Sequence, residues 1–202
     1  MPLGLFINVF KITQKIKPLV LCILDGWGIA ADSGVNAITQ AKPANFNALW
    51  FSYPHTYLTT WGKSVGLPEG QVGNSEVGHE NLGAGRIVFQ DSLRIDLAIE
   101  NQAFFENEAL LRTTDFARSN NSDIHIMGLA SLGSVHSKLA HLFAILSLLK
   151  AAQVPKDKIK LHLFTDGRDA PPTSSASLFK QIEQKLQVEN LAQIASISGR
   201  YY

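Results

Sequence analysis

The chain has 202 residues, which is enough for one domain or for one domain and part of a second. Its apolar fraction of 46% suffices for a hydrophobic core and excludes disorder of the whole chain, and its net charge of +1 gives no basic surplus for binding nucleic acid. The one cysteine, Cys22, excludes an intrachain disulfide, and no apolar run reaches the roughly 18 residues of a membrane span. We therefore expect neither a nucleic acid nor a membrane as a partner.

The first 18 residues differ in composition from the rest of the chain. They contain three lysines and no acidic residue, and their apolar stretch precedes the lysines. A secretory signal has the opposite order, with positive charge before the apolar stretch. We interpret residues 1–18 as an N-terminal extension, with a transit peptide or a short amphipathic arm as the alternatives.

The next part of the chain passes from regular patterns to a glycine-rich stretch. A continuous apolar run predicts a strand buried on both faces over 19–24, and helical spacing interrupted by Pro43 follows over 35–50. A second strand is predicted over 55–61. Seven of the fifteen glycines then fall within residues 62–85, which predicts a loop whose backbone closely approaches another group.

The remainder of the chain alternates between helix and strand patterns. Strands that alternate with helices form parallel sheets with right-handed crossovers, so the sequence predicts an α/β fold. The predicted strands are 124–130, 158–165 and 192–198, and the predicted helices are 107–119, 136–152 and 177–188.

Polar side chains follow these three strands, at the point where each strand ends. His136 follows the first strand, Arg168 and Asp169 follow the second, and Arg200 follows the third. Sites in open α/β sheets form at the carboxyl ends of the strands, and arginines bind phosphate or carboxylate groups bidentately. The sequence therefore predicts a site for an anionic ligand at this edge.

Each of these positions also has a purely structural interpretation. Asp166 and Asp169 are typical of turns, and His136 is placed where it could cap the helix that follows. Capping does not explain arginines at two adjacent strand ends, so the joint pattern favours a functional site.

The glycine-rich stretch fails the tests for several familiar motifs. A P-loop would need glycine at position 57, which is Tyr, and a nucleophile elbow would need glycine at position 77, which is Val. A possible dinucleotide fingerprint at Gly26 and Gly28 lacks the acidic residue that binds ribose. What remains is Ser75 in a flexible backbone, with polar side chains close to it in sequence.

Seven segments, in order from about Pro18 to the last residue, are long enough to identify a family. They are Asp25-Gly-Trp-Gly28, Gly66-Leu-Pro-Glu-Gly-Gln71, Gly73-Asn-Ser-Glu-Val-Gly-His79, Asn81-Leu-Gly-Ala-Gly-Arg86, Val135-His-Ser137, Asp166-Gly-Arg-Asp169 with Pro171-Pro172, and Ser198-Gly-Arg-Tyr-Tyr202. Together they resemble the cofactor-independent phosphoglycerate mutases of the alkaline-phosphatase superfamily.

The resemblance implies a cytoplasmic glycolytic isomerase, monomeric at full length. It would interconvert 3-phosphoglycerate and 2-phosphoglycerate through a phosphoserine, with two divalent metal ions, usually manganese. Metal coordination would activate the serine hydroxyl, which is otherwise a poor nucleophile. By the family's pattern, Asp25 matches a metal ligand, Ser75 matches the nucleophile and a metal ligand, and His136, Arg168, Asp169 and Arg200 match residues that bind phosphoglycerate.

The chain departs from the family's pattern at four positions. Where the family usually has Asp, Gly and His around His136, this chain has Leu132, Ser134 and Lys138, and Glu80 stands where the family usually has Met. Leu132 removes a carboxylate beside the substrate site, and Ser134 replaces a residue of greater backbone freedom.

Members of this family are more than twice as long as this chain. By their arrangement, residues 19–92 are the first segment of a metal-binding phosphatase domain, and residues 93–202 are part of an inserted phosphoglycerate-binding domain. Asp25 and Ser75 alone cannot hold two metal ions, so we expect most metal ligands to lie outside this chain and the chain alone to lack mutase activity. The alternatives are a related metal-dependent phosphatase and a non-catalytic remnant that binds a partner or a phosphorylated metabolite.

Overall fold

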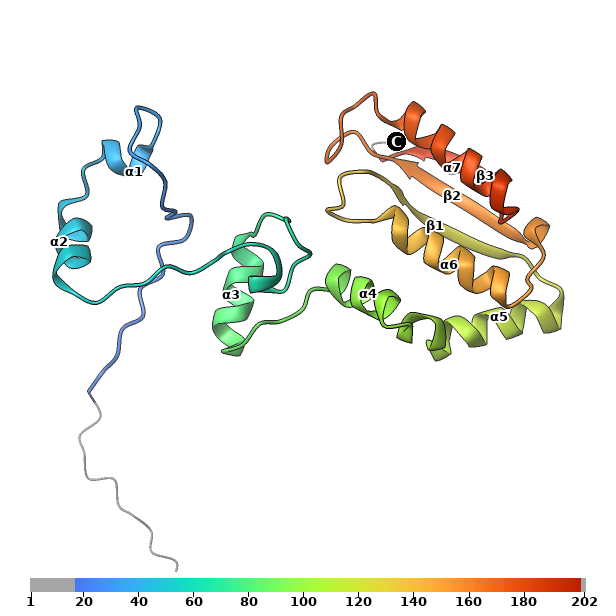
Figure 1. Cartoon of the computed structure of the whole chain (residues 1–202), viewed down its shortest axis with the longest axis horizontal. Coiled ribbons are helices and arrows are strands. Elements are labelled where there is room, and N and C mark those ends of the chain that lie inside the picture. Colours follow the sequence, from blue (N-terminus) through green and yellow to red (C-terminus); the bar gives the residue numbers. More distant parts are fainter. Residues whose placement is uncertain (1–16, 201–202) are drawn as a thin grey trace, which may run out of the picture. The chain divides into compact units, whose positions relative to one another are not determined.

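The computed structural model describes residues 17–200 of the chain (Figure 1). The chain divides into two compact units, Met1–Thr56 and Tyr57–Tyr202, and each unit is described by itself. Of the predicted N-terminal extension, residues 1–16 lie outside the described residues.

Two short helices, α1 (Ala37–Gln40) and α2 (Ala44–Ser52), make up the regular structure described in the first unit. They match the helical pattern predicted across this region, and Pro43 immediately precedes α2 as the sequence indicated. None of residues 17–56 is buried. A row of aromatic contacts holds α2 to its surroundings: the ring centroids lie 4.9 Å apart for Trp27–Phe46, 5.9 Å for Phe46–Trp50 and 3.8 Å for Trp50–His55.

The two strands predicted over 19–24 and 55–61 do not form in this structure. The strands described all lie between Ile124 and Gly199, and Leu19 at the start of the apolar run is 94% exposed. A strand is stable only when a neighbouring strand satisfies its backbone N–H and C=O groups. The described residues provide no such neighbour here, so the prediction from apolar pattern alone was wrong.

The glycine-rich stretch contains more helix than predicted. A 3₁₀ turn, η1 (Gly62–Val65), is followed by α3 (Ser75–Ala84), which begins at the candidate serine. The Asn74 side chain caps α3 by accepting a hydrogen bond from the Val77 N–H at 2.9 Å. Close backbone approach, the other expectation, is confirmed at Gly66: it has φ +81°, and a Cβ there would lie 1.8 Å from the Val88 carbonyl oxygen.

Three helical segments lead from this stretch into the sheet. They are α4 (Asp91–Glu100), the 3₁₀ turn η2 (Ala103–Glu106) and α5 (Glu108–Asn120). The sequence predicted α5. Asn107 caps this helix, because its side-chain oxygen accepts hydrogen bonds from two backbone N–H groups. The sequence did not predict α4, whose one fully buried residue is Leu93.

The predicted alternation of strands and helices is confirmed. The order β1, β2, β3 is the order in the sheet, and both pairings are parallel. The elements are β1 (Ile124–Ala130), α6 (Leu139–Ala151), the 3₁₀ turn η3 (Lys156–Lys158), β2 (Ile159–Thr165), α7 (Ser175–Glu189) and β3 (Gln193–Gly199).

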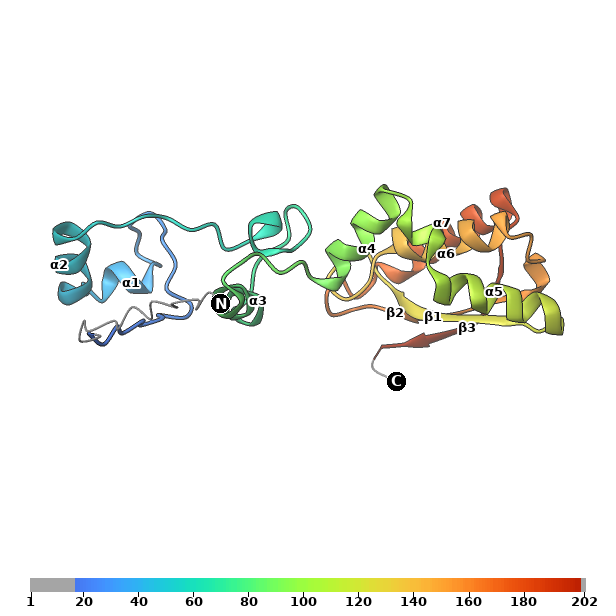
Figure 2. The same ribbon diagram turned by 90° about the horizontal axis from the view of Figure 1, so that it is seen from below.

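The hydrophobic core lies between this sheet and its two crossover helices. Figure 2 shows α6 and α7 on one side of the sheet, as right-handed crossovers require when strands follow one another in order. The fully buried side chains at the centre are Leu146 of α6, Leu161 of β2 and Ile182 of α7. The other side, which we call the open face, carries exposed side chains such as Met127 at 70%.

A helix that crosses a membrane must be both long and apolar. None of the described helices combines the length and apolar character needed for a crossing.

Candidate functional site

The carboxyl ends of β1, β2 and β3 meet around one buried carboxylate, that of Asp166. Its Oδ1 accepts hydrogen bonds from the backbone N–H groups of Gly167, Arg168 and Asp169 at 2.7, 2.9 and 3.1 Å. Its Oδ2 accepts the Ser131 hydroxyl at 2.5 Å, which links the loop after β1 to the loop after β2. Asp166 thus forms the turn that the sequence suggested and also joins two strand ends.

These bonds hold Asp166 ionised. The hydrogen bond from Ser131 is the largest influence and lowers the pKa of the carboxyl, burial raises it, and the three backbone N–H groups lower it further. The net result is a pKa well below the ordinary range of an aspartate. The site therefore has a fixed negative charge at its base at all ordinary pH values.

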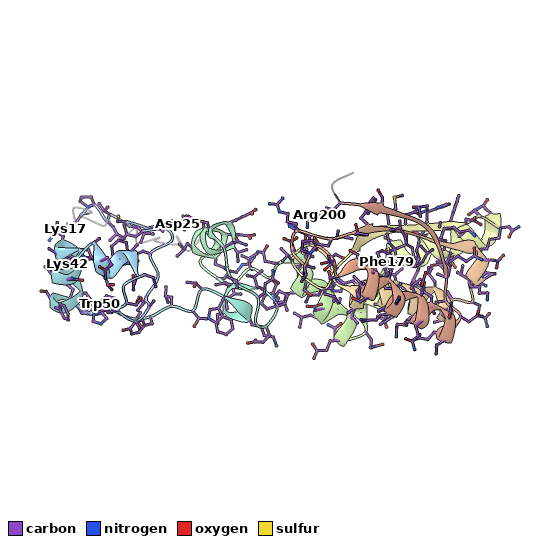
Figure 3. All side chains as sticks on the ribbon, turned by 90° about the horizontal axis from the view of Figure 1, so that it is seen from above. Lys17, Asp25, Lys42, Trp50, Phe179 and Arg200 are labelled. Carbon is purple, nitrogen blue, oxygen red and sulfur yellow. The ribbon has the colours of Figure 1, made fainter. Side chains whose placement is uncertain are left out.

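Arg200 neutralises that charge from the end of β3 (labelled in Figure 3). Its Nη1 donates to Asp166 Oδ1 at 3.1 Å and to Asp169 Oδ2 at 2.6 Å, and its backbone N–H donates to the Thr165 carbonyl at 3.1 Å. Its guanidinium is bound to both carboxylates through a single nitrogen, and a guanidinium has five N–H donors. Donors on the other two nitrogens are not used in these bonds.

The loop after β1 brings a histidine to the same place. His136 Nε2 lies 3.8 Å from Asp169 Oδ2, and the imidazole is 62% exposed. Upstream in the loop, Gly133 packs against the backbone of the loop after β2, since a Cβ there would lie 2.3 Å from the Asp169 carbonyl oxygen. The Ser137 hydroxyl donates to the Leu129 carbonyl at 2.6 Å and fixes the other end of the loop.

Ser134 is the strained residue of this loop. Its φ of +56° lies in the left-handed region, which costs an L-residue other than glycine free energy. The resemblance noted in the sequence led us to expect glycine at this position.

A second ionic cluster, around Asp96, holds the same loop where it joins α6. Asp96 of α4 accepts hydrogen bonds from Lys138 Nζ and from His141 Nε2, the latter at 2.8 Å. Burial raises the pKa of Asp96, and the bonds from Lys138 and His141 outweigh that effect, so the pKa is lowered. Lys138 is the residue immediately before α6, so this cluster ties α4 to the start of that helix.

The structure brings together most, but not all, of the predicted site residues. His136, Asp169 and Arg200 are in contact as a chain of polar side chains. The backbone of Arg168 joins the same turn while its side chain is exposed. Sequence reasoning missed Ser131 as a site residue, and it treated Asp166 as a turn residue. The available signal was the position of Asp166 directly after a strand predicted to be buried, since a charge placed there must be paired.

Asp25 and Ser75 lie in different units, so each is described separately. Asp25 is an exposed residue of a turn in the first unit, and Ser75 is the exposed first residue of α3 in the second. Among residues 17–200, no three His, Cys, Asp or Glu side chains gather in a way that could hold a metal ion. The described residues therefore do not fit a complete site for two metal ions.

The buried carboxylate gives a testable dependence of stability on pH. We expect Asp166→Asn to lower the free energy of unfolding at pH 7 by about 3 kcal/mol, because it leaves buried donors unpaired. The native pKa lies below the ordinary value of 3.8, so the charge contributes fully above that value and the contribution is lost as the pH falls through the native pKa. The difference between the two proteins should shrink between about pH 5 and about pH 2.

Urea unfolding followed by circular dichroism across this pH range measures the difference. Asp157→Asn, at an exposed position of η3, is the matched control and should change stability little. A difference between wild type and Asp166→Asn that stays constant from pH 7 to pH 2 would show that Asp166 is not held ionised by its partners.

The strained loop residue gives a second prediction. Ser134→Gly should raise the free energy of unfolding by about 1 kcal/mol, because glycine adopts positive φ without a steric cost. The control Ser122→Gly, at a position without positive φ, should be neutral or destabilising because it only adds freedom to the unfolded chain. Thermal unfolding of both variants tests the contrast, and a Ser134→Gly protein less stable than wild type would contradict it.

Comparison with known proteins identifies the family. Residues 95–202, just over half of the chain, match the family model described as "BPG-independent PGAM N-terminus". The 2,3-bisphosphoglycerate-independent phosphoglycerate mutase of Moorella thermoacetica is 47% identical over 186 residues, covering 92% of this chain and 36% of that protein. The same-named protein of Escherichia coli O1:K1 / APEC is 49% identical over the same length and with the same coverage.

A solved structure agrees with the sequence comparisons. The phosphoglycerate mutase of Leishmania mexicana, determined at low cobalt concentration, has a TM-score of 0.62 and 31% identity, covering 76% of this chain and 28% of that one. The chain spans about a third of the length of the curated relatives it matches. It belongs to the 2,3-bisphosphoglycerate-independent phosphoglycerate mutase family.

Proposed function

We propose that this member of the family supplies the substrate-holding part of an enzyme that interconverts 3-phosphoglycerate and 2-phosphoglycerate. In this proposal His136, Arg168, Asp169 and Arg200 hold the phosphoglycerate, and Ser75 accepts the phosphoryl group. The single observation that carries it is the convergence of His136 and the Asp169–Arg200 pair on the buried Asp166, where three parallel strands end.

The charges of the site suit this substrate. Phosphoglycerate carries a phosphate and a carboxylate, and guanidinium groups bind both kinds of group with paired hydrogen bonds. Arg200 is held by two carboxylates through one nitrogen, which orients it in advance and leaves other donors for the ligand. Arg168 directly precedes Asp169 in the same turn, and its side chain is exposed. It supplies a second guanidinium.

Of the two carboxylates, Asp169 is the one placed to bind the hydroxyl groups of the substrate. Asp169 is partly exposed, so it can accept a hydrogen bond from a glycerate hydroxyl, while the exposed His136 imidazole lies within reach of the same ligand. Both hydroxyls must be held in turn for the phosphate to leave one and return to the other. A polar, partly hydrated cluster allows that exchange better than a rigid apolar pocket would.

Ser75 has a favourable position for a phosphoryl acceptor. It is the first residue of α3, and the dipole of a helix attracts anionic oxygens to its N-terminus. Metal ions would supply Lewis-acid activation when bound, and Asp25 and Ser75 are the proposed ligands within this chain. Because the described residues gather no further ligands, we assign the remaining ones to residues outside this chain and derive no step through the metals.

The domain arrangement proposed from the resemblance is compatible with the exposed apolar run. Residues 19–92 would be the first segment of a metal-binding domain of alkaline-phosphatase type, and 93–202 would be part of the phosphoglycerate-binding domain. An apolar segment of strand length that is exposed in this chain would then pair within a sheet completed by other residues of a longer protein. The glycolytic role would place that protein in the cytoplasm, as a monomer with a small-molecule substrate.

Binding without catalysis is the second candidate function for this chain. The assembled site at the ends of β1–β3, beside the lack of a three-ligand metal group among residues 17–200, favours it for the 202 residues taken alone. A related metal-dependent phosphatase fits less well, because hydrolysis has no need for a second site that holds glycerate.

Substrate binding tests the proposed site. We expect isothermal titration calorimetry to show one 3-phosphoglycerate bound per chain, and Arg200→Ala to weaken binding at least tenfold because a charged hydrogen-bonded contact is lost. Arg112→Ala removes an exposed arginine on α5 and is the control that should leave binding unchanged. Equal affinity in wild type and Arg200→Ala would reject the site, as would the absence of any binding.

A turnover assay tests whether catalysis needs residues outside this chain. We expect the purified 202-residue chain with manganese to convert no 3-phosphoglycerate above background in an enolase-coupled assay. Its proposed metal ligands, Asp25 and Ser75, are too few for two ions. Measurable mutase activity that Ser75→Ala abolishes would refute this expectation.

A further inference from the structure

Two histidines on the open face of the sheet lie within hydrogen-bond distance of each other. His125 Nδ1 of β1 is 2.9 Å from His162 Nε2 of β2, and the two rings are stacked with their centroids 5.2 Å apart. Neither residue belongs to the anion site at the strand ends. Among the described residues of the second unit, Figure 2 shows no helix on this side of the sheet, and both ring contacts are exposed.

The strand register explains why the rings meet. His125 is paired with Lys160, and Met127 with His162, so the two histidines are diagonal neighbours on adjacent strands. Side chains on the same face of a sheet at this spacing are within reach when they are long or aromatic. The backbone of the sheet therefore holds the two imidazoles in place.

A bulge in β3 adds a third group to the pair. The register shifts between Leu161 and His162, so that His162 is opposite Ser196 and Ala195 has no partner. The Ser196 hydroxyl consequently lies 2.7 Å from His162 Nδ1. When His162 donates its ring proton to Ser196, its Nε2 carries a free lone pair directed toward His125.

The distance between the two nitrogens matches metal coordination. With metal–nitrogen bonds of about 2.05 Å, two ligands at a right angle are about 2.9 Å apart, whereas tetrahedral ligands are about 3.3 Å apart. Right-angled nitrogen ligands are typical of Cu²⁺ and Ni²⁺. A neutral imidazole has one ring proton, so His125 needs only to carry it on Nε2 to present Nδ1 to the ion.

We propose that His125 and His162 form a two-imidazole site for a divalent copper- or nickel-type ion, with Ser196 orienting His162 and water completing the coordination. The second ring N–H of a ligating histidine usually donates a hydrogen bond to a neighbouring acceptor, which is the role given to the Ser196 hydroxyl. Lys160 is the one charged side chain within the three strands, and its Nζ donates to Gln193 Oε1 at 2.7 Å rather than to either imidazole.

Copper titration tests the site on the 202-residue chain. In a non-coordinating buffer at pH 7.5, electron paramagnetic resonance should show one Cu²⁺ per chain with two nitrogen ligands, and calorimetry should give its affinity. His125→Asn and His162→Asn should each weaken this binding at least tenfold, and Ser196→Ala by about tenfold. His55→Asn and His79→Asn, which remove exposed histidines elsewhere, should have no effect.

The outcomes separate this proposal from its alternatives. Copper bound with unchanged affinity in both His125→Asn and His162→Asn would place the ion elsewhere and overturn the proposal, as would a spectrum with a single nitrogen ligand. Should His162→Asn fail to fold, the exposed His125 position and Ser196→Ala still decide the matter. Binding of 3-phosphoglycerate should be the same in these variants, so failure here leaves the anion site untouched.

Discussion

The buried carboxylate of Asp166 is the constraint on which this site depends. A charge that is removed from water must be fully paired, and Asp166 obtains its partners from three different strand ends: Ser131, its own turn, and Arg200. Each partner is fixed in return. The need to satisfy one charge therefore determines where the groups available to a ligand can lie.

The cluster around Asp96 is a second place where the partners of one carboxylate fix the position of a loop. Asp96 binds Lys138 and His141 on either side of the start of α6, and the loop that precedes this helix carries His136. Lysine at position 138 forms an ion pair with Asp96. Ser134 leaves local strain in the same loop.

The sequence predicted the part of the fold in which neighbours in the chain are neighbours in space. The predicted bounds of all three strands of the sheet and of its helices lie within a few residues of the observed ones. Core residues such as Leu161 and Ile182 are buried by elements close in sequence, so the local apolar pattern is enough to locate these elements. The strand predicted over 19–24 did not form, because an apolar run reveals the need for a partner but not whether one is present. Likewise, the strand-end rule located His136, Asp169 and Arg200, but spacing could not show that Asp166 joins them, since that depends on hydrogen bonds between loops.

The order of the strands has a consequence for how the chain acquires its structure. Each strand pairs with the one that precedes it in sequence, across a helical crossover, so the sheet can be built in chain order although its parallel pairings are not local and form more slowly than contacts within a helix. During synthesis, β1, α6 and β2 can associate before β3 has emerged, and β3 then adds to an existing edge. The cluster around Asp166 would be completed last, when Arg200 arrives, so a chain still being made would have a folded core before this cluster is formed.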